Sequence, residues 1–178
     1  MSDPQPKPPV AELRARRETV VREHMESENH HEFDTTIGTF AHPRYEIIAT
    51  GDVYDGEAEV RRYYAETRAA FPDQRNELLA LHHADDAVIV EFDLLGTHLG
   101  PLRGLPATGR AFRCRMCALF VFAEAEIVCE RVYFDQATIL RQLGVARDPS
   151  SPAGRLAMLL SHPLTLGRAL LRERRGRA

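Results

Sequence analysis

The sequence predicts a single α+β domain shaped like a cone, with N-terminal helices closing over a curved, mainly antiparallel sheet around a central pocket. Helical spacing of apolar residues dominates residues 10–71, whereas residues 76–135 alternate with the period of two that is typical of strands. Helices that precede a run of strands, rather than alternating with them, indicate an α+β fold. The 178 residues are 44% hydrophobic, which is enough for one sizeable core.

The first half of the chain is expected to form helices around a small hairpin. A helix begins at Val10, and a second, short helix carries Phe33, Ile37 and Phe40 until Pro43 stops it. Residues 45–50 follow as a strand. Asp55 offers an N-cap for the next helix. One face of that helix carries five residues: Val60, Tyr63, Tyr64, Thr67 and Phe71.

The second half is expected to form a meander of four strands and a final helix. The strands are residues 76–83, 87–98, 109–123 and 127–135. The helix runs from Gln136 to Leu143 and ends at Gly144, a residue suited to a left-handed cap.

Alternation assigns an inward face to two of these strands. In residues 87–98 the apolar set includes Phe92 and ends in His98, so His98 is expected to face inward. In the next strand the apolar set runs from Phe112 to Phe122, opposite Arg113 and Arg115.

The last strand is ambiguous. Its two sets are Ile127, Cys129, Arg131, Tyr133 and Asp135 on one side and Val128, Glu130, Val132 and Phe134 on the other. The first set could converge in a pocket, or it could be a solvated face that carries an Arg–Asp pair. Periodicity alone does not decide between these readings.

Charge and cysteine content exclude several classes of function. The net charge of −3 gives no reason to expect nucleic acid as a partner. Cys114 and Cys117 lie three apart on a predicted strand and so face opposite sides of the sheet, which excludes a shared metal ion. The start of the chain lacks the apolar run of a signal peptide, and no stretch is long enough to span a membrane, so we expect a cytoplasmic protein.

The chain is expected to divide into three parts: a disordered, proline-rich arm (1–9), the α+β cone (10–145) and a basic, leucine-rich, helical C-terminal extension (146–178). Residues 151–178 carry six arginines against Glu173, a local charge of +5, so the first 150 residues sum to −8. A basic amphipathic helix can bind an anionic membrane surface. The alternatives are packing on a sister subunit or across the mouth of the pocket.

Three segments in a fixed order carry a resemblance to a known family. Residues 96–100 read GTHLG, residues 104–110 read GLPATGR, and Asp135 is followed by LRQLG at residues 140–144. The sequence resembles the SnoaL-like polyketide cyclases and related ester cyclases, within the superfamily of nuclear transport factor 2 and ketosteroid isomerase. The resemblance covers about residues 12 to 145. The sequence departs from the family pattern at Cys129–Arg131, where many of these cyclases have a tryptophan.

The resemblance implies a cofactor-independent cyclase that closes a ring in a small, hydrophobic, polyketide-like substrate by an intramolecular aldol reaction. It places the acid/base role on Asp135 and puts His98 in the pocket, where we expect it as a second catalytic residue that donates to the developing enolate. We expect an apolar pocket to raise the pKa of Asp135. The other candidate substrate-binding residues are Arg131, Tyr133, Tyr64 and Phe92. We expect neither a cofactor nor a metal ion, and we expect a homo-oligomer, either a dimer or a tetramer.

Two alternatives use the same fold. An epoxide hydrolase of the limonene type activates water with an Asp-Arg-Asp set, but the nearest match here, Arg113-Cys114-Arg115, has an arginine in place of an aspartate. The second alternative is a non-catalytic domain that binds a small molecule or acts as a scaffold, because a pocket does not imply turnover.

Overall fold

A computed structural model describes residues 9–176, and nearly all of the predicted disordered arm lies outside these described residues. The described chain forms helices α1 (Val10–Asn29), α2 (Phe33–Gly38), α3 (Glu57–Ala70), α4 (Gln136–Gln142), α5 (Pro152–Ser161) and α6 (Pro163–Gly176). Its strands are β1 (Arg44–Ile47), β2 (Asp52–Asp55), β3 (Arg75–His83), β4 (Ala87–Thr97), β5 (Ala111–Ala123) and β6 (Glu126–Phe134).

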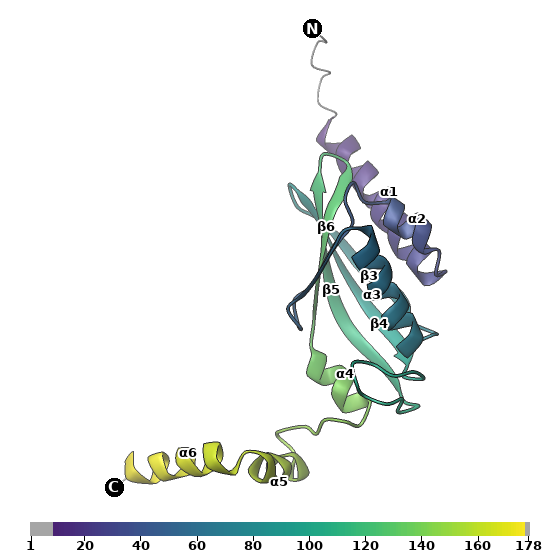
Figure 1. Cartoon of the computed structure of the whole chain (residues 1–178). Coiled ribbons are helices and arrows are strands. Elements are labelled where there is room, and N and C mark those ends of the chain that lie inside the picture. Colours follow the sequence, from purple (N-terminus) through teal and green to yellow (C-terminus); the bar gives the residue numbers. More distant parts are fainter. Residues whose placement is uncertain (1–8, 177–178) are drawn as a thin grey trace.

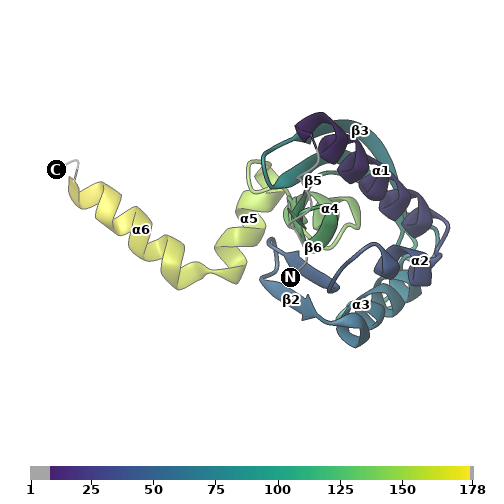
Figure 2. The same cartoon turned by 90° about the horizontal axis from the view of Figure 1, so that it is seen from above.

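The six strands form one curved sheet in the order β2-β1-β6-β5-β4-β3. Neighbouring strands pair antiparallel except β1 and β6, which pair parallel. Helices α1, α2 and α3 cover one face of the sheet, and α4 lies at the end of the cone away from the start of α1 (Figure 1). Seen from above, the sheet and these helices enclose a ring (Figure 2). The predicted α+β cone is therefore confirmed.

The core lies between the sheet and the helices, and the inward faces of β4 and β5 agree with the predicted alternation. Val88, Val90, Phe112 and Phe120 are each less than 5% exposed. Burial of these apolar side chains is the main contribution to the stability of the cone.

The interior also holds a polar network that joins α1 to β1 and α3. His24 Nε2 lies 2.8 Å from the hydroxyl of Tyr45, which also hydrogen-bonds the hydroxyl of Tyr64. The other ring nitrogen of His24 lies 2.9 Å from the hydroxyl of Thr39. Buried polar groups need such partners, because an unpaired group in the interior is costly.

The ambiguity of the last predicted strand is resolved by a β-bulge. Ile127 pairs with Phe122, but Cys129 pairs with Val121, so one residue of β6 has no partner in the ladder. A bulge exchanges the two faces of a strand beyond it. As a result, Val132 and Phe134 face inward on the same side as Ile127, whereas simple alternation placed them on the opposite side.

Two predicted helix ends can be compared with the structure. Gly144 has a φ of +76°, so it adopts the left-handed conformation predicted for the residue after the last helix of the cone. The N-cap of α3, in contrast, is Gly56 rather than Asp55. The carboxylate of Asp55 instead forms an ion pair with Arg44, 2.6 Å away, because Asp55 belongs to β2 beside β1.

The C-terminal extension forms two helices, α5 and α6, which are separated by His162, and Pro163 is the first residue of α6. Both project away from the cone in Figures 1 and 2. Four of their described leucines are exposed (Leu156, Leu159, Leu160 and Leu164), and Leu160 and Leu164 are each 74% exposed. No helix among the described residues is long and apolar enough to cross a membrane.

Candidate functional site

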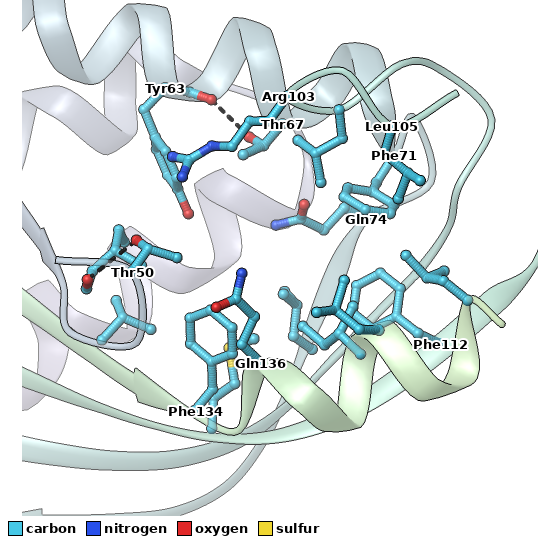
Figure 3. Close-up of a pocket in the computed structure, with 18 residues that line it drawn as sticks. Thr50, Tyr63, Thr67, Phe71, Gln74, Arg103, Leu105, Phe112, Phe134 and Gln136 are labelled. Carbon is cyan, nitrogen blue, oxygen red and sulfur yellow. Dashed lines mark hydrogen bonds between the residues drawn. The ribbon is translucent and has the colours of Figure 1, made fainter. Parts of the chain in front are cut away.

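A cavity of about 170 Å³ opens in the cone between α3, α4 and the inner face of the sheet. Figure 3 shows its lining side chains converging from these elements and from the loop of residues 98–110. Most of the lining is apolar. The lining residues are Ile47, Thr50, Tyr63, Thr67, Phe71, Gln74, Leu94, Leu102, Arg103, Leu105, Phe112, Met116, Val132, Phe134, Gln136, Ile139, Leu140 and Leu143.

Three polar side chains point into this cavity from different sides: Tyr63 of α3, Gln74 before β3 and Gln136 of α4 (Figure 3). Neither the two side-chain amides nor the Tyr63 hydroxyl has a hydrogen-bond partner among the described residues, although Gln74 is only 5% exposed. Burial raises the pKa of Tyr63, so its hydroxyl stays protonated and can donate. Together the three groups offer two amides and a hydroxyl to a bound molecule.

Arg103 is the only charged residue among the described lining residues. Its Nη2 atom donates to Asp52 Oδ2, 2.6 Å away, and to the hydroxyl of Tyr54, 3.0 Å away. Its side chain is 52% exposed, so it stands where the cavity meets solvent. Arg103 thereby connects the 98–110 loop to β2.

His98, a predicted catalytic residue, is fully buried beside the cavity wall, and its side chain does not line the cavity. Its Nδ1 atom accepts a hydrogen bond of 3.2 Å from the backbone N–H of Thr108, so the neutral ring carries its proton on Nε2. Nε2 has no partner among the described residues. The ring lies 5.2 Å from that of Phe71, which does line the cavity. In this conformation His98 holds the 98–110 loop through Thr108 and packs against Phe71 in the cavity wall.

Asp135, the predicted acid/base residue, lies directly before Gln136 but is itself outside the cavity lining. Its carboxylate is the N-cap of α4, accepting hydrogen bonds from the Ala137 N–H at 3.0 Å and the Thr138 hydroxyl at 2.6 Å. It also pairs with Arg141 at 3.1 Å. The expectation of a raised pKa was wrong: the Thr138 hydroxyl, above all, lowers the pKa of this exposed carboxyl.

The bulge in β6 directs two other predicted site residues outward. Arg131 forms an ion pair of 2.8 Å with Glu46 on β1, and Tyr133 is 43% exposed. These residues belong to a partly solvated strand face, the alternative left open above. Arg131 pairs with Glu46 rather than with Asp135.

Tyr64 and Phe92, the remaining predicted substrate-binding residues, are 1% and 5% exposed and pack in the core. Tyr64 stacks on Phe33, with ring centroids 4.4 Å apart. Neither residue lines the cavity, whereas the adjacent Tyr63 does.

The pair Arg113 and Arg115 lies on the outer face of the sheet around Asp93. Each Nε atom donates to a different oxygen of that carboxylate at 2.7 Å. None of the three side chains lines the cavity, so this set is not positioned to activate water there. This placement argues against the epoxide-hydrolase alternative.

Sequence reasoning missed Gln74, Arg103 and Gln136. Gln136 lies two residues after the end of β6, a strand whose inward register depends on the bulge, and Arg103 is brought to the cavity by a tight turn. Tyr63 was predicted only as part of one helix face, and it is Tyr63 and Thr67 of that face, with Phe71 after the helix, that line the cavity.

Comparison with solved structures places the fold among known proteins. IdmH of Streptomyces antibioticus, described as a candidate polyketide cyclase, is 24% identical, with a TM-score of 0.62 over 72% of this chain and 99% of its own. A SnoaL-like protein from Jannaschia is 17% identical, with a TM-score of 0.67 over 83% of this chain and 100% of its own. AclR of Streptomyces galilaeus, described as a candidate hydroxylase, is 18% identical, with a TM-score of 0.65 over 75% of this chain and 98% of its own.

Because these sequence identities are low, the structural similarity establishes the fold alone. Proteins described with different activities, a cyclase and a hydroxylase, share this fold. No curated protein matches the chain. The family model of the SnoaL-like polyketide cyclases, however, matches residues 18–143, which is the cone from the middle of α1 to the end of α4. The chain therefore belongs to the SnoaL-like polyketide cyclase family.

Proposed function

We propose that the protein binds a small, mainly apolar carbonyl compound in the cavity and closes a ring in it by proton transfer. The observation that carries the binding proposal is the trio Tyr63, Gln74 and Gln136, whose polar groups face an apolar cavity without protein partners. Of the three, Gln74 is buried, and a buried amide without a partner is costly, so a ligand oxygen at hydrogen-bond distance offsets that cost. The complement is an apolar molecule with one or two carbonyl or hydroxyl groups.

The size of the cavity limits the ligand. An engineered cavity of about 150 Å³ in another protein binds benzene, so about 170 Å³ holds roughly one aromatic ring. Further atoms must extend toward the mouth, where Arg103 lies. A small polyketide-like molecule fits this description better than a fused polycycle.

For ring closure, the protein must stabilise an enolate oxygen and move one proton. The Tyr63 hydroxyl, kept protonated by burial, is a suitable donor to the developing oxyanion. Asp135 is our proposed base, since one carboxylate can remove a proton from an acidic carbon and later return it to the new alkoxide. To act on a ligand in the cavity, the carboxylate must first leave its cap contacts with Ala137 and Thr138. His98 is proposed to position the wall through Phe71.

Binding is tested by titrating the protein with acetophenone, a single ring with one carbonyl, and following the shifts of backbone amides by NMR. We expect saturable shifts around α3 and α4, weakened about fivefold or more by Tyr63→Phe. Tyr133→Phe, which removes an exposed hydroxyl outside the cavity, is the matched control and should bind like wild type. Equal weakening by both variants, or no binding by wild type, would contradict the proposal.

Catalysis is tested separately by the exchange of the acetophenone methyl protons in D₂O, which requires the same proton abstraction as an aldol closure. Wild type should accelerate the exchange and Asp135→Asn should lose most of the acceleration, whereas Asp148→Asn should keep it. Acceleration that survives Asp135→Asn would exclude Asp135 as the base. Binding without any acceleration would favour the non-catalytic alternative.

A further inference from the structure

Arg103 occupies an unusual backbone position for an arginine. Residues Leu102 and Leu105 exchange backbone hydrogen bonds of 2.9 and 2.8 Å, which closes a two-residue turn. Both central residues have positive φ, +47° at Arg103 and +84° at Gly104, as such turns require. A long side chain in the left-handed region is strained, and such strain is concentrated at functional sites. An Asn or Gly would fit this turn with less strain, so the turn alone does not explain an arginine here.

The guanidinium group is only partly used by the protein. Nη2 donates to Asp52 and Tyr54, which fixes the plane of the group. The N–H groups on Nε and Nη1 have no partner among the described residues, although Arg103 lines the cavity. Three donors of a permanent cation therefore remain for a ligand or for water at the mouth.

The charged groups around the cavity indicate which class of ligand the free donors of Arg103 would bind. Arg103 is the one ionisable cation among the described lining residues, and no carboxylate is among them. Asp52 lies beyond the Nη2 edge of the guanidinium, and Arg62 lies over the Tyr54 ring at 5.5 Å. An apolar chamber with a single cation at its mouth complements an apolar molecule that ends in an anionic oxygen group.

We propose that Arg103 is a specificity residue that selects small apolar ligands bearing a carboxylate, with the ring in the cavity and the carboxylate on the free Nη1 group at the mouth. This inference rests on the proposed binding function of the cavity and adds the chemical class of its ligand. The carboxylate binds without displacing Asp52, because Asp52 accepts from Nη2 and leaves the N–H groups of Nη1 free.

The test compares phenylacetate with phenylacetamide, which share the ring and the carbonyl but differ in charge. In an NMR titration at low salt, wild type should bind phenylacetate about tenfold more tightly than the amide. Arg103→Gln should remove this preference and keep the affinity for the amide. Arg75→Gln is the matched control, because Arg75 is also 52% exposed and lies on β3 outside the cavity lining. That variant should keep the preference.

The outcomes separate the two proposals. Binding of both probes with equal affinity by wild type, or a preference that survives Arg103→Gln, would overturn the role of Arg103 and leave the cavity proposal standing. Failure of wild type to bind either probe would overturn both. If Arg103→Gln does not fold, the wild-type preference is measured at rising salt, where it should shrink if it depends on charge. A preference independent of salt would overturn the inference.

Discussion

The hydroxyl group of Thr138 donates a hydrogen bond of 2.6 Å to the carboxylate of Asp135, three residues earlier in the chain. Asp135 is the cap of α4 through the backbone N–H of Ala137, and the Thr138 contact, more than any other interaction, lowers its pKa. The residue expected to be a base in an apolar pocket is therefore an exposed carboxylate that is ionised throughout the neutral range.

Thr138→Val is expected to raise the pKa of Asp135 toward its ordinary value, because it removes the main hydrogen bond to the ionised form. A folded-state pKa that is lowered contributes stability above the unfolded pKa, and this stability is lost as the pH falls through the folded value. The excess stability of wild type over Thr138→Val should therefore disappear in acid. Carboxyl NMR titration measures the pKa directly, with Asp148 as an internal control. A wild-type pKa above 3.8 would contradict this account.

Tyr45→Phe is expected to destabilise the cone by about 1–3 kcal/mol, because its buried hydroxyl bonds both His24 and Tyr64. Tyr133→Phe removes an exposed hydroxyl and should change the free energy of unfolding by no more than about 0.5 kcal/mol. Urea unfolding of both variants provides the comparison. Similar changes in the free energy of unfolding for the two substitutions would show that the buried polar network contributes little to stability.

Gly100→Ala is expected to destabilise the protein by about 1–3 kcal/mol. A Cβ at this position would lie 2.0 Å from the carbonyl oxygen of Ala69, while the N–H of Gly100 donates to the Ala70 carbonyl at 3.1 Å. The loop must then move away from the end of α3. Gly38→Ala is the control, because an added Cβ there meets nothing within 4 Å. Equal melting temperatures of the two variants would contradict the close approach of Gly100 to the carbonyl group of Ala69.

Deletion of residues 150–178 is expected to leave the melting temperature of the cone and its affinity for acetophenone unchanged, because α5 and α6 project away from the cone. Calorimetric unfolding and the NMR titration test the two expectations. A loss of ligand affinity on deletion would instead support the idea that the extension covers the mouth of the cavity. Liposome cosedimentation of the full chain and the deletion variant separately tests membrane contact.

Local patterns were sufficient to predict most of the fold. The alternation in β4 and β5 identified the buried faces, because each strand has one clearly apolar set. Gly144 was identified as the end of α4 because few other residues adopt a positive φ without strain. The face of α3 that lines the cavity was also visible in the spacing of its aromatic and apolar residues.

The site was harder to predict, because it depends on irregular features. The bulge near the start of β6 leaves no clear pattern in the sequence, yet it turns Arg131 and Tyr133 outward and Val132 inward. Arg103 reaches the cavity from a tight turn, and its side chain is held there by Asp52 and Tyr54 of a distant segment. Gln74 looks like an ordinary polar loop residue until the burial of its amide is known.

The central claim is that the cavity, rather than the outer face of β6, binds the carbonyl ligand. The most direct test is a crystal structure of the protein in complex with acetophenone. We predict the ring among Phe71, Met116 and Phe134, with the carbonyl oxygen within about 3 Å of the Tyr63 hydroxyl. A ring bound on the strand face beside Arg131 and Tyr133, with the cavity empty, would contradict the account.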